Sequence, residues 1–408
     1  MEYKFIEGSV TAAKGFQASG IHCGIRKNKS KRDLGLIYCE KKCTAAAVYT
    51  TNLVQSSPIT VTRKNLTDGF AQAVIVNSGN ANTCNADGEK KAEEMCSLTA
   101  KALNINAEDV IVASTGVIGQ VLPIEPIAEG MDELVSQLSS DLSGGTNAAE
   151  AIMTTDTVKK EVAAEVVIGG KTVTIGGISK GSGMIHPNMA TMLCFITTDA
   201  AISSEMIQKA VKTAADKTFN MISIDGDTST NDTLSVMASG LAGNDEITCE
   251  NEDYHLFVNA LEAVCKELSK MMAKDGEGAT KLLVCKVSGA KTEKDAKGVA
   301  KSVICSSLLK AAMFGADANW GRVLCAIGYS GCDVDVRKID VSFASESGTI
   351  DVCKNGAGID FSEELAKTIL TRDEIDIMVA LNDGEAYAEA YGCDLTYEYV
   401  KINGDYRT

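Results

Sequence analysis

The sequence predicts a mixed α/β protein. Short apolar runs that end in glycine-containing turns alternate along the chain with longer segments in which apolar residues recur at helical spacing. Strands that alternate with amphipathic helices are typical of sheets covered by helices. The 408 residues are enough for about two or three domains, and neither a tandem repeat nor a low-complexity linker divides them.

Two strand-and-loop units are expected in the first third of the chain. The apolar run AVIVNSG at 73–79 ends in turn residues, and a helical segment at 89–104 follows it. The run DVIVASTGVIG at 109–119 repeats the pattern of a strand that enters a glycine loop. A helix is expected from Ile124 to Leu138, because prolines stand at its start.

The middle of the chain predicts a hairpin and then two strand–helix pairs. The segment EVAAEVVIGGKTVTIGGI at 161–178 is expected to turn at Gly169-Gly170. The elements expected after it are a strand at 191–198, a helix at about 203–218, a strand at 233–239 and a long amphipathic helix at about 253–273.

The C-terminal part begins with the polar loop DGEGATK at 275–281. A further strand is expected to begin in the segment KLLVCKVSG that follows. One helix is expected over 297–313 and another over 362–370, with short strands elsewhere. A domain boundary is expected near residue 280.

Composition excludes several classes of function. The net charge of −16 argues against a nucleic-acid surface, because binding phosphates needs clustered Lys and Arg. An apolar run of 18 residues is absent, and the N-terminus lacks the basic and apolar blocks of a secretory signal. A soluble protein that acts on small molecules is therefore expected.

The cysteine and histidine pattern gives little support to a metal site. The 14 cysteines contain no C-x-x-C pair, and His22, His186 and His255 are the only histidines. Most of the cysteines are expected to be reduced and buried. The loop DGDTSTND at 225–232 lacks the glycine and the glutamate that a calcium loop needs at its sixth and twelfth positions.

The segment STGVIG at 114–119 is one candidate for chemistry. It follows an apolar strand, so its backbone N–H groups are able to hold a developing oxyanion. It lacks the Gly-Lys-Ser/Thr of a phosphate-binding loop. A purely structural glycine turn is the alternative.

Thr191 is the sharper candidate. It stands after Ala190, between a glycine-containing loop and an apolar strand. If the Ala190–Thr191 peptide bond is cleaved, the freed α-amino group, whose reference pKa is about 8, lies on the same residue as the hydroxyl and can accept its proton. One residue then supplies nucleophile and base, which removes the need for a histidine. His186, in the loop before it, is a weaker candidate for a general base.

Several motifs, in order and over most of the chain, together resemble the ornithine acetyltransferase family (glutamate N-acetyltransferase of the arginine pathway). The motifs are NSGNANTCNADG (77–88), STGVIGQ-LP (114–123), AIMTTDT (151–157), KGSGMIHPNMATMLCFITTDA (180–200), the segment at 222–233, DGEGATK (275–281) and FGADANWGR (314–322).

The resemblance implies a precursor that cuts itself between Ala190 and Thr191. Residues 1–190 become an α chain and residues 191–408 a β chain, of which about 191–280 completes the core and about 281–408 forms a C-terminal α/β lobe. It also implies a two-layer sheet core flanked by helices (an αββα-like sandwich), a cytoplasmic location and an assembly of two α and two β chains.

The same matching of motifs implies the functional residues. Thr191 carries the acetyl group as an ester, and Thr115 and Gly116 stabilise the oxyanion. Thr155 stands beside Thr154 in the same motif and remains an alternative to it. The amino-acid site is implied to contain Thr154, Lys180, Thr191, Glu277, Asn403 and Thr408.

These implied residues suit a ping-pong acyl transfer. Lys180 offers a point charge to a carboxylate, Glu277 suits an ammonium group, and Asn403 supplies a donor and an acceptor. N-acetylornithine would acetylate Thr191, and glutamate would take the acetyl group to give N-acetylglutamate. Neither a metal nor a bound organic cofactor is expected, and acetyl-CoA is retained as an alternative co-substrate.

Two other functions stay open at this point. One is a related N-terminal-nucleophile aminopeptidase or amidase, in which water accepts the acyl group. The other is an uncleaved amino-acid-binding or scaffold protein, in which Thr191 only opens a strand and STGVIG is a structural turn.

Overall fold

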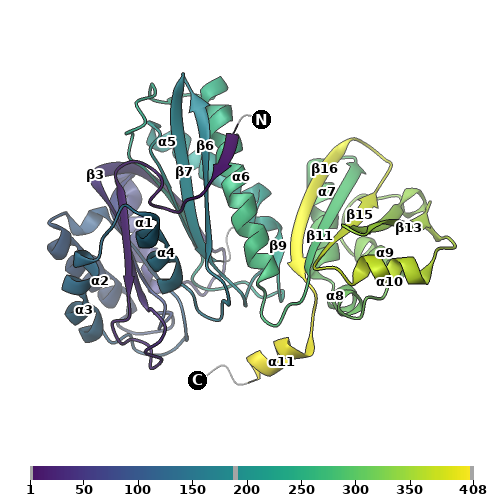
Figure 1. Ribbon diagram of the computed structural model, residues 1–408, viewed down its shortest axis with the longest axis horizontal. Coiled ribbons are helices and arrows are strands. Elements are labelled where there is room, and N and C mark those ends of the chain that lie inside the picture. The colour runs from purple at the N-terminus through teal and green to yellow at the C-terminus, as the bar shows by residue number, and fades with distance from the viewer. Residues whose placement is uncertain (1–2, 187–191, 405–408) are drawn as a thin grey trace. The chain divides into compact units, whose positions relative to one another are not determined.

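The computed structural model describes residues 3–186 and 192–404, which form two compact units (Figure 1). The first unit contains the described residues of 1–181, 187–220 and 228–268. The second contains residues 182–186, 221–227 and the described part of 269–408. Ala190 and Thr191 lie outside the described residues, between His186 and Met192. The predicted start of a strand at 191 is therefore outside them as well.

The first unit is built on a mixed nine-stranded sheet in the order β1-β6-β7-β8-β10-β3-β4-β5, with β2 paired to β3. Strands β8 and β10 run parallel, as do β4 and β5, and the other pairings are antiparallel. The strands are β1 Tyr3–Ile6, β2 Phe16–Ile21, β3 Leu34–Tyr49, β4 Phe70–Asn77, β5 Val110–Ser114, β6 Lys160–Ile168, β7 Lys171–Lys180, β8 Leu193–Thr198 and β10 Thr233–Ala238.

Helices cover this sheet because each has an apolar stripe. One core lies between β2, β3, β4 and β5 and the helices α2 and α3, and another includes small buried residues of α4. The helices are α1 Ser57–Asn65, α2 Gly88–Leu103, α3 Glu125–Ser136, α4 Leu142–Ala151, α5 Ser204–Lys217 and α6 Glu252–Lys274, with 3-10 turns at Leu66–Asp68, Ala107–Asp109 and Phe219–Met221. The last residues of α6, from Ser269, belong to the second unit.

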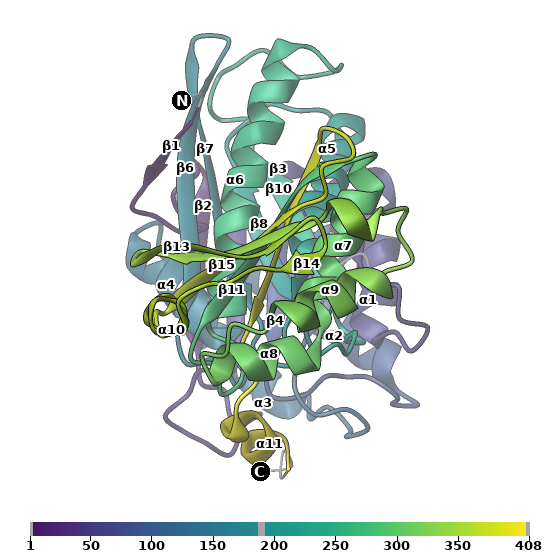
Figure 2. The same cartoon turned by 90° about the vertical axis from the view of Figure 1, so that its right-hand side faces the viewer.

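The second unit has a seven-stranded sheet in the order β14-β13-β12-β15-β11-β16-β9. Figure 2 labels β11, β13, β14 and β15 of this sheet. Alternate residues of β15, namely Ile375, Ile377 and Val379, are buried in a core that also takes residues of α7, α8, α9 and α10. The elements are β9 Ile222–Ser223, β11 Leu282–Ala290, α7 Glu293–Cys305, α8 Ser307–Phe314, α9 Trp320–Gly328, a 3-10 turn at Val336–Lys338, β12 Asp340–Ser345, β13 Gly348–Lys354, β14 Ala357–Gly358, α10 Glu363–Leu370, β15 Glu374–Ala380, β16 Ala386–Cys393 and α11 Tyr397–Asn403.

The predicted mixed α/β class is confirmed, since both sheets are flanked by helices. The predicted hairpin is also confirmed: β6 and β7 join at Gly169 and Gly170, whose φ angles of 54° and 74° suit glycine. The single helix expected over 297–313 is wrong. The chain leaves helical geometry at Ser306, with ψ at 105°, and the Ser306 hydroxyl accepts the Leu309 N–H as the cap of α8.

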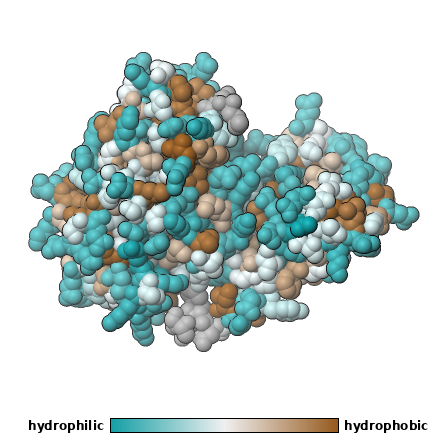
Figure 3. Space-filling view, viewed as in Figure 1, coloured by the Kyte–Doolittle hydropathy of each residue, from teal (hydrophilic) through white to brown (hydrophobic). Residues whose placement is uncertain are grey.

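No helix among the residues that the structure describes is long and apolar enough to cross a membrane. On the face drawn in Figure 3, hydrophilic side chains separate the apolar ones into small groups.

Candidate active site

Thr115 and Gly116 lie where two neighbouring parallel strands end. Strand β4 ends at Asn77 and β5 at Ser114, and these two residues are register partners. Carboxyl ends of parallel strands are common places for ligands. The Thr115 N–H donates to the Asn77 carbonyl at 2.9 Å, and Asn80 forms isolated bridges with both Thr115 and Val117. The two segments that leave the strands are therefore joined to each other.

Gly116 has to be a glycine in this turn. Its φ is 134°, and a Cβ atom there would lie 2.8 Å from the Asn80 nitrogen and 2.8 Å from the Gly79 carbonyl carbon. The backbone of residues 79–80 therefore approaches Gly116 more closely than any side chain would permit. That closeness supports a shaped turn, and the oxyanion role of Thr115 and Gly116 stays a prediction.

Asparagine side chains of the motif NSGNANTCNADG hold the loop that faces Gly116. Asn77 Oδ1 accepts the Asn80 N–H at 3.0 Å, and Asn77 Nδ2 donates to Ser114 Oγ at 2.6 Å. Asn80 Nδ2 donates to the Gln120 carbonyl at 3.1 Å, and Asn80 Oδ1 accepts the Asn82 N–H at 2.7 Å. The sequence identified the motif, but not the groups to which its amide side chains hydrogen-bond. The run of asparagines is the only sequence signal for such hydrogen bonds to the backbone.

Lys180 and Thr154 are brought together by a buried carboxylate that the sequence did not indicate, Asp156. Its Oδ2 accepts the Thr154 N–H at 2.9 Å, while its Oδ1 accepts the Gly181 N–H at 2.8 Å and the Lys160 ammonium at 2.6 Å. Asp156 and Lys160 have fully buried side chains. The Thr154 contact is made by its backbone N–H, so it does not decide between the Thr154 and Thr155 hydroxyls as the predicted substrate contact.

The charges of this group depend on one another. Burial alone would raise the pKa of Asp156, but the positive charges of Lys180 and Lys160 hold that pKa well below its usual range. Burial lowers the pKa of Lys180 from its ordinary value, and the negative charge of Asp156 opposes that shift. Lys180 ends β7 and is the register partner of Leu193, the first residue of β8.

Asp232 is a second buried carboxylate that the sequence did not indicate. The Thr233 N–H donates to the Met192 carbonyl at 2.8 Å, so β10 places Asp232 beside the residue that follows Thr191 in the chain. Burial raises the pKa of Asp232 well above its ordinary value, and Ser229 and Lys180 oppose that shift only in part. Its Oδ2 atom has no hydrogen-bond partner in the part of the chain that the structure describes.

Three predicted positions have no structural description. Ala190, Thr191 and Thr408 lie outside the described residues, so the predicted bond, the predicted nucleophile and the last predicted substrate residue stay predictions.

Glu277 and Asn403 are brought together in the second unit. Asn403, at the end of α11, donates from Nδ2 to Glu277 Oε2 at 2.7 Å, and the Glu277 N–H donates to the Ser182 carbonyl at 2.8 Å. Gly183 leaves room for the carboxylate, because a Cβ atom there would lie 2.4 Å from the Glu277 carboxyl carbon. Glu277 is buried, contrary to what a charged residue in a polar loop suggests.

His186 is held in the second unit as a neutral ring. Its Nδ1 lies 3.1 Å from Ser223 Oγ and 3.4 Å from Cys305 Sγ. Burial and the positive charge of Lys301 lower the pKa of His186 to about 4. In the same unit, the Asp225 carboxylate accepts the Ile185 N–H at 2.9 Å, which fixes the backbone just before His186.

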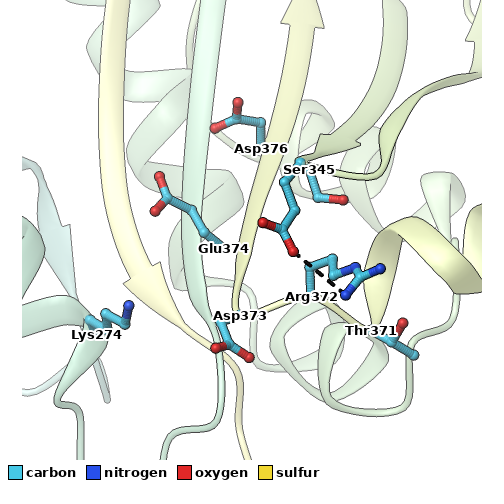
Figure 4. A pocket seen from close by; sticks show the side chains of 8 residues that line it. Lys274, Ser345, Thr371, Arg372, Asp373, Glu374 and Asp376 are labelled. Atoms are coloured by element: carbon cyan, nitrogen blue, oxygen red, sulfur yellow. Dashed lines mark ion pairs between the residues drawn. The ribbon is translucent and has the colours of Figure 1, made fainter.

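A separate pocket of about 470 Å³ in the second unit contains none of the predicted site residues (Figure 4). Carboxylates dominate it, and Arg372 pairs with Glu346 at 3.5 Å across one side. The residues that form it are Lys274, Ser345, Glu346, Thr371, Arg372, Asp373, Glu374 and Asp376. Among the described residues no group of His, Cys, Asp or Glu side chains is arranged to hold a metal ion.

Comparison with known proteins accounts for nearly the whole chain. The chain is 49% identical over 406 residues to the "Arginine biosynthesis bifunctional protein ArgJ" of Caldanaerobacter subterraneus subsp. tengcongensis, covering 99% of this chain and 100% of that protein. It is 50% identical over 401 residues to "Arginine biosynthesis bifunctional protein ArgJ 1" of Clostridium acetobutylicum, covering 98% of each. A crystal structure of the ArgJ protein from Bacillus halodurans matches 52% of this chain and 97% of its own with 47% identity and a TM-score of 0.49. The ArgJ family model matches residues 17–408, and the chain belongs to the ArgJ family.

Proposed function

We propose that this chain is an acetyltransferase of arginine biosynthesis that moves the acetyl group of N-acetylornithine to glutamate. The observation that carries the proposal is family membership over almost the full length, with relatives at 49% and 50% identity that are named bifunctional proteins of arginine biosynthesis. The buried groups around Lys180 and Glu277 support it, because charged side chains are rarely buried without a purpose in binding or pairing.

The proposed reaction has two half-reactions on Thr191. The Thr191 hydroxyl attacks the acetyl carbonyl of N-acetylornithine while the α-amino group of the same residue takes the hydroxyl proton. The carbon–nitrogen bond then breaks, that proton passes to the departing nitrogen, and ornithine leaves an acetyl ester on Thr191. The amine of glutamate attacks the ester, and N-acetylglutamate leaves as the hydroxyl is restored. This scheme needs the cleavage of the Ala190–Thr191 bond, because only then is the α-amino group free.

Hydrogen-bond donors of the turn at Thr115 and Gly116 complete the proposed chemistry. A tetrahedral oxyanion forms once in each half-reaction. The Gly116 N–H and the Thr115 hydroxyl are the proposed donors in both, because the Thr115 N–H already donates to the Asn77 carbonyl. The shape of that turn supports the assignment, since Gly116 has a φ of 134°, which favours glycine, and its backbone lies close to that of Gly79 and Asn80.

The proposed amino-acid contacts follow from charge. Lys180 would pair with a substrate carboxylate, and its neighbour Asp156 favours the ammonium form that this pairing needs. Glu277 would receive a substrate ammonium group, and Asn403 would hold the Glu277 carboxylate in place. Thr154 and Thr408 complete the proposed set.

The relatives are named bifunctional, and we propose acetyl-CoA as a second acetyl donor. Glutamate would accept the acetyl group from it in the second activity. The competing function is an amidase of the N-terminal-nucleophile kind, in which water accepts the acyl group.

One experiment separates these functions. Fresh wild-type protein and a Thr191→Ala variant are run on a denaturing gel and incubated with N-acetylornithine and glutamate. We expect the wild type to give two fragments and N-acetylglutamate, and the variant to give one intact chain and no transfer. Acetate without N-acetylglutamate would favour the amidase, and an intact, inactive wild type would favour a binding protein. Glutamate with acetyl-CoA, assayed in parallel, tests the second donor.

A further inference from the structure

Asn231 is a buried asparagine that connects the first residues of β10 with the turn at Thr115 and Gly116. It lies in the loop before β10, all within the first unit, and only 7% of its surface is exposed. The proposed mechanism gives it no part, since its side chain is not among the groups expected to touch a substrate.

The amide of Asn231 uses its whole capacity for hydrogen bonds. Nδ2 donates to the Ala81 carbonyl at 2.6 Å and to the Ser114 carbonyl at 2.8 Å. Oδ1 accepts from the Thr83 hydroxyl at 3.0 Å and from the Thr230 hydroxyl at 2.5 Å. A primary amide has two donor hydrogens and two acceptor lone pairs, so the orientation of this side chain is fixed on every side.

The two carbonyls that Asn231 holds border the turn. Ser114 directly precedes Thr115, and the Ala81 N–H donates to the Val117 carbonyl at 3.1 Å, on the other side of Gly116. The backbone of Asn231 continues into β10, which pairs in parallel with β8 from Thr233 opposite Leu193. One side chain therefore joins the segments on both sides of the turn to the loop that leads into this pair of strands.

We infer that Asn231 is a positioning residue that places the Thr115–Gly116 backbone relative to β8 and β10. The inference rests on the proposed function, in which this turn binds the oxyanion. An oxyanion donor acts only when it is fixed where the charge develops, and removal of one donor lowers kcat by about 100- to 1,000-fold. A displacement of about 1 Å by a residue away from the chemistry lowers the rate by about 100-fold.

The substitution that tests the inference is Asn231→Asp. Aspartate keeps the size of the side chain and one acceptor oxygen, but it replaces both donor hydrogens with an oxygen that faces the Ala81 and Ser114 carbonyls. We expect kcat for acetyl transfer to fall by about 10- to 100-fold, while the KM for glutamate changes by less than about twofold, because Asn231 makes no proposed contact with the amino acid.

Asn244 offers a matched control in the same unit. It is 8% exposed, its Oδ1 accepts the Ala201 N–H at 2.9 Å, and its Nδ2 donates to the Ala201 and Asp245 carbonyls at 3.1 and 2.7 Å. Asn244→Asp thus removes the same kind of clamp from a loop that makes none of these contacts with the turn. We expect both substitutions to lower the urea midpoint, because each removes buried hydrogen-bond donors, but we expect Asn244→Asp to leave kcat close to that of the wild type.

The outcomes separate the inference from the proposed function. An active wild type with unchanged kcat in Asn231→Asp, or an equal fall of kcat in Asn244→Asp, overturns the inference alone. A wild type without transfer activity overturns the proposed function and the inference with it. If Asn231→Asp does not fold, Thr83→Val, which removes one hydrogen bond to Asn231 Oδ1, is measured instead; a fall in kcat at unchanged KM supports the inference, and an unchanged kcat overturns it.

Discussion

Replacing Asp156 by Asn should destabilise the first unit strongly. The carboxylate has three donors around it: the Lys160 ammonium at 2.6 Å, the Gly181 N–H at 2.8 Å and the Thr154 N–H at 2.9 Å. Asparagine offers one oxygen in place of two, so one of these donors would face an NH2 group. The substitution also leaves the positive charges of Lys160 and Lys180 buried without the negative charge that offsets them.

The expected size follows from the burial of the pair. Side chains of Asp156 and Lys160 are both 0% exposed, and removing one partner of such a pair reduces the free energy of unfolding by about 3–5 kcal/mol. Urea unfolding of the Thr191→Ala precursor with and without Asp156→Asn measures this difference on a single intact chain. The matched control is Glu93→Gln, since Glu93 pairs with Lys64 at 3.1 Å with both side chains more than half exposed, and such a pair contributes about 0–1 kcal/mol.

The pH dependence of the difference gives a second check. The pKa of folded Asp156 lies below its usual range, whereas the unfolded chain has an ordinary value of about 3.9. The stabilisation is therefore complete above about pH 5 and is lost as the pH falls through the unfolded and then the folded pKa. The difference in the free energy of unfolding between the parent and Asp156→Asn should be constant from neutral pH to about pH 5. It should become smaller in stronger acid. The reasoning would be refuted if Asp156→Asn lowered the free energy of unfolding no more than Glu93→Gln does. It would also be refuted if the difference between Asp156→Asn and its parent grew in acid.

Three further predictions concern single positions. Gly116→Ala should lower kcat by about 100-fold or more, because the new Cβ atom would collide with the Asn80 backbone at 2.8 Å; a steady-state assay with normal kcat would contradict it. Gly183→Ala should raise the KM for the amino-acid substrates with little change in the urea midpoint, since its Cβ atom would displace the Glu277 carboxylate from 2.4 Å away; an unchanged KM would contradict it. Ser306→Ala should lower the free energy of unfolding by about 1 kcal/mol through loss of the α8 cap, and a change near zero would show that the cap is not needed.

The parts of the fold that follow local rules were predictable from the sequence. The β6–β7 hairpin has two glycines between alternating segments, and the turn needs φ above zero at both of them. The break at Ser306 was missed because apolar residues continue at helical spacing through it, and only the cap geometry ends α7. Strand β3 runs over Leu34–Tyr49 with a bulge between Tyr38 and Cys43, so its residues do not alternate regularly.

The site was predictable only as motifs. Glycine and asparagine motifs marked the turn at Gly116, but nothing local indicates which carbonyls an asparagine such as Asn231 will hold. Asp156 and Asp232 were missed for another reason: carboxylates are mostly exposed, and burial of these two depends on strands that lie far apart in the sequence.

The order of the first sheet has a consequence for the proposed self-cleavage. Strands β8 and β10 would belong to the β chain, yet they lie between β7 and β3, which would both belong to the α chain. Six register pairs join β7 to β8 and six join β10 to β3, so the fragments are interleaved within one hydrogen-bonded sheet. Cutting the peptide bond would not let them drift apart. Unfolding, by contrast, would release two separate chains, so the cut protein should refold at a rate that depends on concentration, whereas the uncut precursor should not.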